Sequence, residues 1–249
     1  ISNNHWINPH IYRQIPFDSE KDIAPISVIG STPVVLVVNP EVPARNTREL
    51  VALARARPGE LNYGSAGNGT VLHLAGVLFT SEAGVDIRHV PYKGLSQMTA
   101  DLIGGQIQMG WGGVATVAPQ VKAGKLRALA VTSGKRSAAA PQIPTVAESG
   151  VPGYEIAAWG GFMAPKGLPK ELIARLNTEL NTALKVKTIQ DAYNAAGVLT
   201  NGGSAEQFTE FLRSETEKWT RVVREAHIRM MSVLIGASVM LTMSMGMRQ

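Results

Sequence analysis

The pattern of apolar and polar positions divides the middle of the chain into alternating strands and helices. Residues 34–38 form an apolar run of strand length, and residues 47–56 repeat apolar side chains at the spacing of one helical face. Further strands are expected at 61–65, 87–90, 107–111 and 126–132. Three more helices are expected between them: one begins at Thr70, a second includes Met98 and Leu102, and a third ends at Gly124. This alternation predicts an α/β fold in which helices cover both faces of a mostly parallel sheet.

Two extended segments, 25–33 and 155–163, bracket this unit, and we expect them to form the two strands of a hinge. Two amphipathic helices follow, and their apolar stripes are interpreted as core contacts. The first carries Leu172, Ile173, Leu176, Leu180 and Leu184; the second opens with the capping box Ser204–Gln207 and carries Phe208, Phe211, Leu212, Trp219, Val222 and Val223.

The segment from Leu61 to His73 combines a short strand, a turn of small residues and the start of a helix. A glycine-rich turn lets backbone N–H groups approach a ligand, and the first turn of a helix leaves its N–H groups without internal partners. Together these features predict a site for a carboxylate, phosphate or sulfate. The candidate residues are Ser65, Ala66, Gly67, Asn68, Gly69 and Thr70.

This motif leaves an alternative open, because it matches neither of the common phosphate-binding loops. No Gly-Lys-Ser/Thr follows it, and Gly64, Gly67 and Gly69 lack the spacing of a dinucleotide fingerprint. A tight strand-to-helix turn without a ligand explains the same residues. His73 and His89 are similarly open: each is either a ligand contact or a packed side chain.

Composition narrows the functional classes. A chain of 249 residues with 45% apolar and 17% charged residues is long enough for one large or two smaller globular domains. The absence of cysteine excludes disulfides and thiolate metal sites. The net charge of +5 comes from scattered residues, so no nucleic-acid partner is expected. No acidic or histidine cluster has metal-ligand spacing, no general base can be assigned to Ser65, and neither a cofactor nor an enzyme is predicted.

The two ends of the chain each suggest an expectation. The chain starts at Ile1 without a signal-peptide pattern, and we expect that its beginning is missing. Residues 230–247 contain 18 residues without a charge, near the lower limit for a membrane-spanning helix. This tail resembles the first helix of a major-facilitator-type transporter, so we interpret it as a fused reading frame; a membrane anchor is the alternative.

Several long sequence segments together resemble those of one protein family. They are NPHIYRQIPFDSEKDIAPIS at 8–27, LNYGSAGNGTVLHLAG at 61–76, HVPYKG at 89–94, AGKLRALAVTSGKRS at 123–137 and PTVAESGVPGYE at 144–155. Over residues 2–226 the chain is similar to the solute-binding proteins of tripartite tricarboxylate transporters, the Bug family. The resemblance implies a protein that captures a small organic carboxylate in the periplasm and delivers it to the membrane components of such a transporter, without catalysis.

The resemblance also implies a type II periplasmic-binding-protein-like fold with two lobes, each built on a mostly parallel sheet flanked by helices. Residues 1–33 and 156–228 would form a remnant of the first lobe, 34–155 the second lobe, and 229–249 a tail outside the fold. The first strand–helix units of the family, with their P-x-x-G-G-type loop, have no counterpart in this chain. We therefore expect an incomplete first lobe, weak or no ligand binding, and exposed sheet edges. The full-length protein is expected to be monomeric.

By resemblance, Ser65 to Thr70 would form the carboxylate clamp of the second lobe, and Ser2, Asn3 and His5 match a loop of the first lobe that faces the cleft. Relatives that bind amino acids often have an aspartate at the position of Gly112. Its absence favours a plain mono- or dicarboxylate, although a glycine that merely fits a tight turn is the alternative. Two other functions remain open: an effector-binding domain of a regulatory protein, and an enzyme that acts on a phosphorylated substrate.

Overall fold

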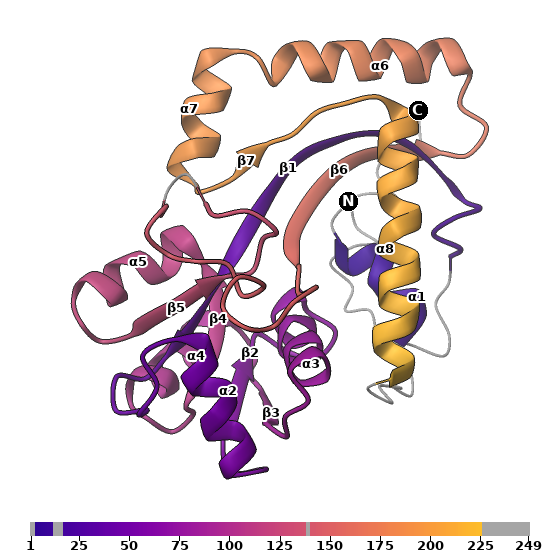
Figure 1. The fold of residues 1–249 in the computed structure, drawn as a ribbon. Coiled ribbons are helices and arrows are strands. Elements are labelled where there is room, and N and C mark those ends of the chain that lie inside the picture. Colours follow the sequence, from indigo (N-terminus) through magenta and orange to yellow (C-terminus); the bar gives the residue numbers. More distant parts are fainter. Residues whose placement is uncertain (1–2, 12–16, 138–139, 226–249) are drawn as a thin grey trace.

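The structure is a computed structural model that describes residues 3–11, 17–137 and 140–225 (Figure 1). Strands and helices alternate through the middle of the chain, as the hydrophobic pattern predicts. In chain order the elements are α1 (Asn3–Ile11), β1 (Ile23–Val38), α2 (Thr47–Ala56), β2 (Asn62–Ser65), α3 (Val71–Ala83), β3 (Arg88–Pro91), α4 (Leu95–Ile103), β4 (Met109–Gly113), α5 (Val114–Lys122), β5 (Arg127–Val131), β6 (Ala157–Pro165), α6 (Lys170–Ala183), α7 (Lys187–Ala195), β7 (Leu199–Thr200) and α8 (Ala205–Glu225).

The strand β1 joins two segments that the sequence pattern treats as separate. Its first part pairs antiparallel with β6, from Ile23 opposite Pro165 to Pro33 opposite Ala157. From Val34 onward it pairs instead with β4 and β5. A proline cannot donate a hydrogen bond to a neighbouring strand, so Pro33 suits the point at which the partners change. The apolar run 34–38 is therefore the second half of one long strand.

The sheet has the order β3-β2-β4-β1-β5, and β6 and β7 pair with the first part of β1. β2 runs parallel to β3 and β4, while β4 and β5 both run antiparallel to β1. β2, β3, β4 and β5 therefore share one direction, as expected for a mostly parallel sheet. The opposite direction of β1 was not predicted, because an apolar run does not encode strand direction.

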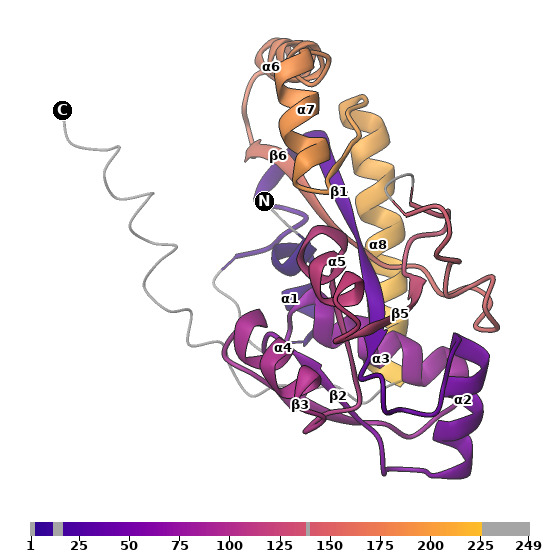
Figure 2. The ribbon, with the colours of Figure 1, turned by 90° about the vertical axis from the view of Figure 1, so that its left-hand side faces the viewer.

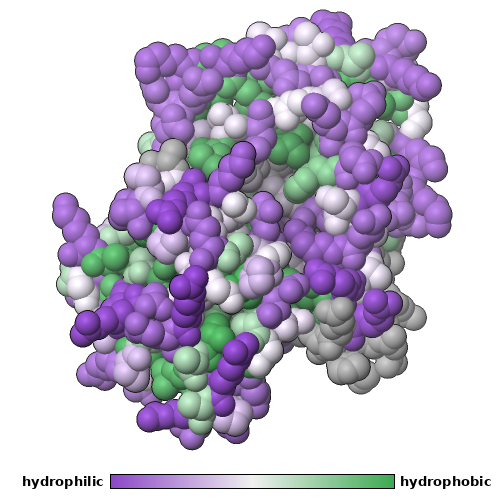
Figure 3. Space-filling model, in the orientation of Figure 1, coloured by the Kyte–Doolittle hydropathy of each residue, from purple (hydrophilic) through white to green (hydrophobic). Residues whose placement is uncertain are grey.

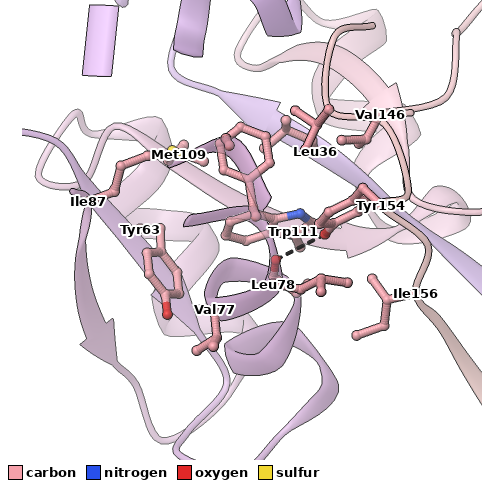
Figure 4. Close-up of a cluster of buried hydrophobic side chains, with 14 of the residues drawn as sticks. Leu36, Tyr63, Val77, Leu78, Ile87, Met109, Trp111, Val146, Tyr154 and Ile156 are labelled. Carbon is pink, nitrogen blue, oxygen red and sulfur yellow. Dashed lines mark hydrogen bonds between the residues drawn. The ribbon is translucent and has the colours of Figure 1, made fainter. Parts of the chain in front are cut away.

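Alternate residues of β1 supply the cores on the two faces of the sheet. Val34, Leu36 and Val38 belong to a large cluster with α2 and α3, part of which is shown in Figure 4, while Val35 and Val37 pack with residues of α4 and α5. Helix α3 is apolar nearly all round, and each residue from Leu72 to Phe79 is buried. The sheet contacts one side of α3 and α8 contacts another, which accounts for this burial (Figure 2).

The last two predicted helices differ from each other in burial. In α8, Phe208, Leu212 and Trp219 are buried, which confirms the interpretation of most of its stripe as core. In the stripe of α6, Leu172 is 44% exposed and Leu176 is 42% exposed, so the same interpretation was wrong for these two residues, whereas Leu184, at the end of the helix, is buried. The physical reason is that α6 meets the strand layer largely through polar side chains.

Two asparagines attach α6 to the strand layer. Asn177 Nδ2 donates to the Ile26 and Gly203 carbonyls at 2.7 and 2.8 Å, and Asn181 Nδ2 donates to Gly203 at 3.0 Å. Because these amides face the sheet, part of the leucine stripe points away from it. Figure 3 shows apolar surface among hydrophilic residues in the upper part of the molecule, where α6 lies.

The predicted division into lobes stays a prediction, and two observations bear on it. The change of partner along β1 falls between Pro33 and Val34, at the predicted boundary. Helix α8, however, extends from the small cluster around Phe208 into the large cluster, where Trp219 lies. The apolar tail 230–247 lies outside the described residues. Within the described part of the chain, none of the helices has the length and apolar character needed to cross a membrane.

Candidate functional site

The β2–α3 turn lies where β2 ends at Ser65 and α3 begins at Val71, with Thr70 as the N-cap residue. Gly67 and Gly69 adopt φ angles of 128° and 75°, which disfavour residues with a side chain. The backbone therefore reverses tightly at the carboxyl end of β2. In open α/β sheets this edge is where ligands bind.

The two hydroxyl groups of the turn make internal hydrogen bonds. Ser65 is fully buried, and its Oγ accepts from the Gly67 N–H at 3.2 Å and lies 2.7 Å from His89 Nε2. Thr70 Oγ1 donates to the Gly67 carbonyl at 2.7 Å and accepts from the His73 N–H at 3.4 Å. In this structure both hydroxyls therefore hold the shape of the turn, and their contact with a ligand stays a prediction.

The backbone N–H groups of the turn fall into two sets. Those of Gly67, Gly69 and Thr70 donate to acceptors within the turn or on α3. Those of Ala66, Asn68, Val71 and Leu72 have no acceptor among the described residues. Unpaired N–H groups at the positive end of a helix dipole are donors for an anion. The structure thus places free donors in the predicted segment and at the first two residues of α3.

Two histidines lie against the turn. His73 is 6% exposed, and its Nδ1 accepts from the Gly69 N–H at 3.1 Å. Its ring stacks on that of His89 at a centroid distance of 4.1 Å, and His89 stacks on Tyr63 at 4.8 Å. Burial lowers the pKa of both histidines to about 4, and for His89 the neighbouring His73 adds to the effect. Both are packed side chains, and both also bond to residues of the turn.

The contact between His89 and Ser65 corrects one statement from the sequence. A histidine does lie within hydrogen-bonding distance of Ser65, although no general base could be assigned from spacing, because β3 brings His89 beside β2. Ser65 is nevertheless buried, and its Oγ accepts the Gly67 N–H. The hydroxyl therefore has no exposed face toward a substrate. The parallel pairing of these two strands, which the sequence predicts only in general terms, is the signal that could have indicated the contact.

The other predicted ligand residues lie in two places. Ser2 is outside the described residues, and His5 lies on α1. Asn3 is buried, and its Nδ2 donates to the Ala157 carbonyl at the start of β6, at 3.3 Å. Gly112 is buried in β4, and a Cβ atom there would lie 2.5 Å from Val117 Cγ1. A side chain at position 112 would therefore point toward α5, and the glycine fits this close packing.

A cavity of about 510 Å3 lies elsewhere, between α8 and the start of β6. Its wall includes Glu215, whose Oε2 accepts from the indole N–H groups of Trp159 and Trp219, each at 3.1 Å. The cavity borders residues 155–157, which follow β5, whereas the turn follows β2. No residue of the turn lines this cavity, so the two sites are separate. Sequence reasoning missed Glu215; its spacing of four from Trp219 on one helix was the available signal.

No group of three or more His, Cys, Asp or Glu side chains in the described ranges could hold a metal ion. The chemistry that the turn offers is hydrogen-bond donation to a small anion. Its free donors are backbone groups, which do not titrate. The turn is therefore suited to binding a small anion through its backbone.

Comparison with known proteins adds a family and a fold. A family model described as tripartite tricarboxylate transporter family receptor matches residues 1–228. The chain is 37% identical over 220 residues to a protein encoded in the tcbD-tcbE intergenic region of a Pseudomonas species, which covers 88% of this chain and 66% of the relative. It is 36% identical over 211 residues to BugT of Bordetella pertussis, with 85% and 65% covered. The chain thus spans about two thirds of the length of these curated relatives.

Solved structures agree with this match. A protein of R. palustris solved with adipate superposes with a TM-score of 0.80 and 34% identity, over 92% of this chain and 78% of the other. The periplasmic binding protein BugD superposes with a TM-score of 0.77 and 26% identity, over the same shares. These neighbours confirm the predicted α/β fold of the periplasmic-binding-protein type.

Proposed function

Because this chain belongs to the tripartite tricarboxylate transporter receptor family, we propose that it is a solute-binding protein that captures a small organic carboxylate at the β2–α3 turn. The observation that carries the proposal is the set of unpaired N–H groups of Ala66, Asn68, Val71 and Leu72 beside the start of α3. Two of these donors, those of Val71 and Leu72, lie at the positive end of α3, where a carboxylate is stabilised. The adipate in the R. palustris neighbour is a dicarboxylate.

The ligand class follows from what surrounds these donors. Position 112 carries no carboxylate, and a side chain there would point toward Val117. The side chains that form hydrogen bonds in the turn are neutral: Ser65, Thr70, His73 and His89. A ligand ammonium group would find no negative partner in this set. We therefore propose a plain mono- or dicarboxylate as the ligand, in preference to an amino acid.

The proposal extends to location and partner. The family is named for a receptor of a tripartite transporter, and the neighbour BugD is described as periplasmic. We propose that the whole protein works in the periplasm and passes its ligand to the membrane components of such a transporter. We also propose that the lobes divide near Pro33 and Ala157, where β1 exchanges β6 for β4 and β5.

The N–H group of Val71 offers a direct test. Val71 is the first residue of α3, and Thr70 has φ −76° and ψ 158°, the conformation that a residue before proline prefers. A Val71→Pro substitution should therefore keep the helix start and remove one free donor, since proline is well tolerated at this position. Val71→Ala is the matched control, because it shortens the same side chain and keeps the N–H.

We would measure the binding of adipate, malate and related carboxylates by thermal shift at millimolar concentrations, with phosphate esters and amino acids alongside. A hydrogen bond to a charged group contributes about 1.5–3 kcal/mol, so we expect Val71→Pro to bind roughly tenfold to a hundredfold more weakly than Val71→Ala. The two variants should unfold at similar temperatures without ligand. Equal affinities, or a shift only with phosphate esters or amino acids, would contradict the proposal.

A further inference from the structure

Two histidine rings, those of His73 and His89, lie beneath the β2–α3 turn and contact it at residues other than those with free N–H groups. His73 comes from the first turn of α3 and His89 from β3, and their rings stack at 4.1 Å. Each ring contacts a different end of the turn: His89 Nε2 lies 2.7 Å from Ser65 Oγ, and His73 Nδ1 lies 3.1 Å from the Gly69 nitrogen. The pair therefore spans the turn from its first residue to its last glycine.

The direction of one hydrogen bond fixes the protonation state of His73. The Gly69 N–H is a donor, so Nδ1 must present a lone pair, and the ring proton lies on Nε2. A protonated imidazole has two N–H groups and no acceptor. Protonation of His73 would therefore place two donors against each other. His89 differs, because a protonated Nε2 can still donate to Ser65 Oγ.

No negative charge near the pair would compensate a proton. On β2 the titratable neighbour is Tyr63, whose hydroxyl donates to the His73 carbonyl at 3.4 Å. On β3 it is Arg88, beside His89 in sequence, and β4 offers no titratable side chain. The carboxylate on α3, Glu82, is paired with Arg221, and Asp101 on α4 accepts from the Tyr92 hydroxyl. Within the described part of the chain, no carboxylate contacts either ring.

We propose that His73 and His89 are positioning residues of the carboxylate site: as a neutral pair they hold the β2–α3 turn in its binding conformation, and a proton on His73 releases Gly69 and weakens binding. The predicted effect on ligand affinity rests on the proposed function, whereas the conformation of the turn can be observed without a ligand. The expected response is opposite to simple electrostatics, in which a positive charge beside an anion site strengthens binding.

Three variants separate this role from a merely structural one. His73→Asn places Oδ1 where the ring has Nδ1, so it keeps an acceptor for the Gly69 N–H and removes the titration. His73→Leu removes the acceptor at every pH. His10→Asn removes a histidine on α1 and serves as the matched control.

The first measurement is NMR of the 249-residue chain from pH 7 to pH 3.5, following the Gly69 amide and the ring nitrogens of His73. We expect the Gly69 amide and His73 to titrate with one midpoint, well below that of an exposed histidine, in the wild type and in His10→Asn. In His73→Asn the Gly69 amide should not titrate. Titration of His73 without any response of Gly69 would overturn the proposal, as would a His73 proton on Nδ1 at pH 7.

The second measurement is the dissociation constant for adipate at pH 7 and at pH 3.5, the lower end of the NMR titration, where a group with a pKa of about 4 is mostly protonated. We expect the affinity of the wild type to fall at least threefold more than that of His73→Asn, which corrects for protonation of the ligand itself. His73→Leu should bind weakly at both pH values. An equal fall in wild type and His73→Asn would contradict the positioning role. If the wild type binds no carboxylate at pH 7, even at ligand concentrations high enough to detect the weak binding expected of an incomplete first lobe, the proposed function fails, and the NMR result still decides the state of the pair.

Discussion

The two helices α3 and α6 are both rich in leucine, yet the structure places them in opposite surroundings. Helix α3 lies between the sheet and α8, and Leu74 and Leu78 are buried within the large cluster. Helix α6 meets the strand layer through Asn177 and Asn181, and no residue within it is buried. An apolar stripe therefore does not by itself ensure a core contact. The number of elements that surround a helix decides how much of it is buried.

The difference in burial matters for the proposed function, because α3 also presents the first-turn N–H groups of the candidate site. A helix packed on all sides can hold a backbone turn in one conformation. The region of β6 and α6 has a much smaller core, in which Trp6, Trp159, Phe208 and Leu212 form one cluster. The β2–α3 turn thus lies beside the larger of the two buried clusters.

The largest loss of stability is expected from a substitution in the buried helix α3. Leu74 has no exposed surface, so Leu74→Ala removes buried methyl groups and leaves a cavity. We expect the free energy of unfolding to fall by about 2–5 kcal/mol. Urea unfolding followed by circular dichroism would measure it. A loss below about 1 kcal/mol would show that α3 is not held as the structure indicates.

Replacement of a glycine in the same helix by alanine should destabilise the protein, contrary to the usual effect of this substitution in helices. Alanine in place of glycine inside a helix normally stabilises by about 1 kcal/mol. At Gly76, however, a Cβ atom would lie 2.1 Å from Tyr63 Cε2. We expect Gly76→Ala to destabilise by about 1–3 kcal/mol through overpacking. Gly104→Ala is the control: Gly104 has a helical conformation, its nearest contact is 3.4 Å away, and no loss is expected there. Equal effects at both sites would contradict close packing of α3 on β2.

The free energy of unfolding should depend on pH through the pair His73 and His89, which lies against α3. The pKa of both His73 and His89 is lowered from the ordinary 6.5 to about 4 in the folded protein, mainly by burial. As the pH falls, the unfolded chain therefore takes up protons first. The stability from these groups is complete above about pH 6.5 and decreases as the pH falls toward 4.

Urea midpoints measured at intervals between pH 7.5 and 4 would follow this loss. Carboxylates elsewhere contribute to any acid unfolding, so the informative quantity is the difference between wild type and His73→Asn. That difference should change across this range. Parallel curves would mean that His73 has the same pKa in the folded and unfolded states.

The smallest change in stability is expected from substitutions in α6. Leu172 and Leu176 are 44% and 42% exposed, so the double substitution to glutamine removes few buried contacts. We expect the free energy of unfolding to change by less than about 0.5 kcal/mol. Sedimentation velocity should show reduced self-association if this exposed stripe promotes it. A large loss of stability would indicate that the stripe is buried in solution.

Much of the fold and part of the site could be predicted because they depend on local chemistry. The bounds of α2 match the prediction, since its apolar spacing and its start and stop signals lie within a few residues of one another. The capping box at Ser204 and Gln207 forms, with hydrogen bonds of 2.9 and 3.2 Å, for the same reason. The turn between β2 and α3 was found from its glycines and small polar residues.

The sequence by itself determined the alternation of strands and helices, the position of the turn and the resemblance to a receptor family, because each depends on neighbouring residues or extended runs. Only the tertiary structure decided that β1 runs antiparallel to its neighbours and that Leu172 and Leu176 of α6 face outward. It also brought His89 to Ser65 and His73 to Gly69. These features depend on which distant segments meet, and hydrogen-bond partners are chosen only when the chain has folded.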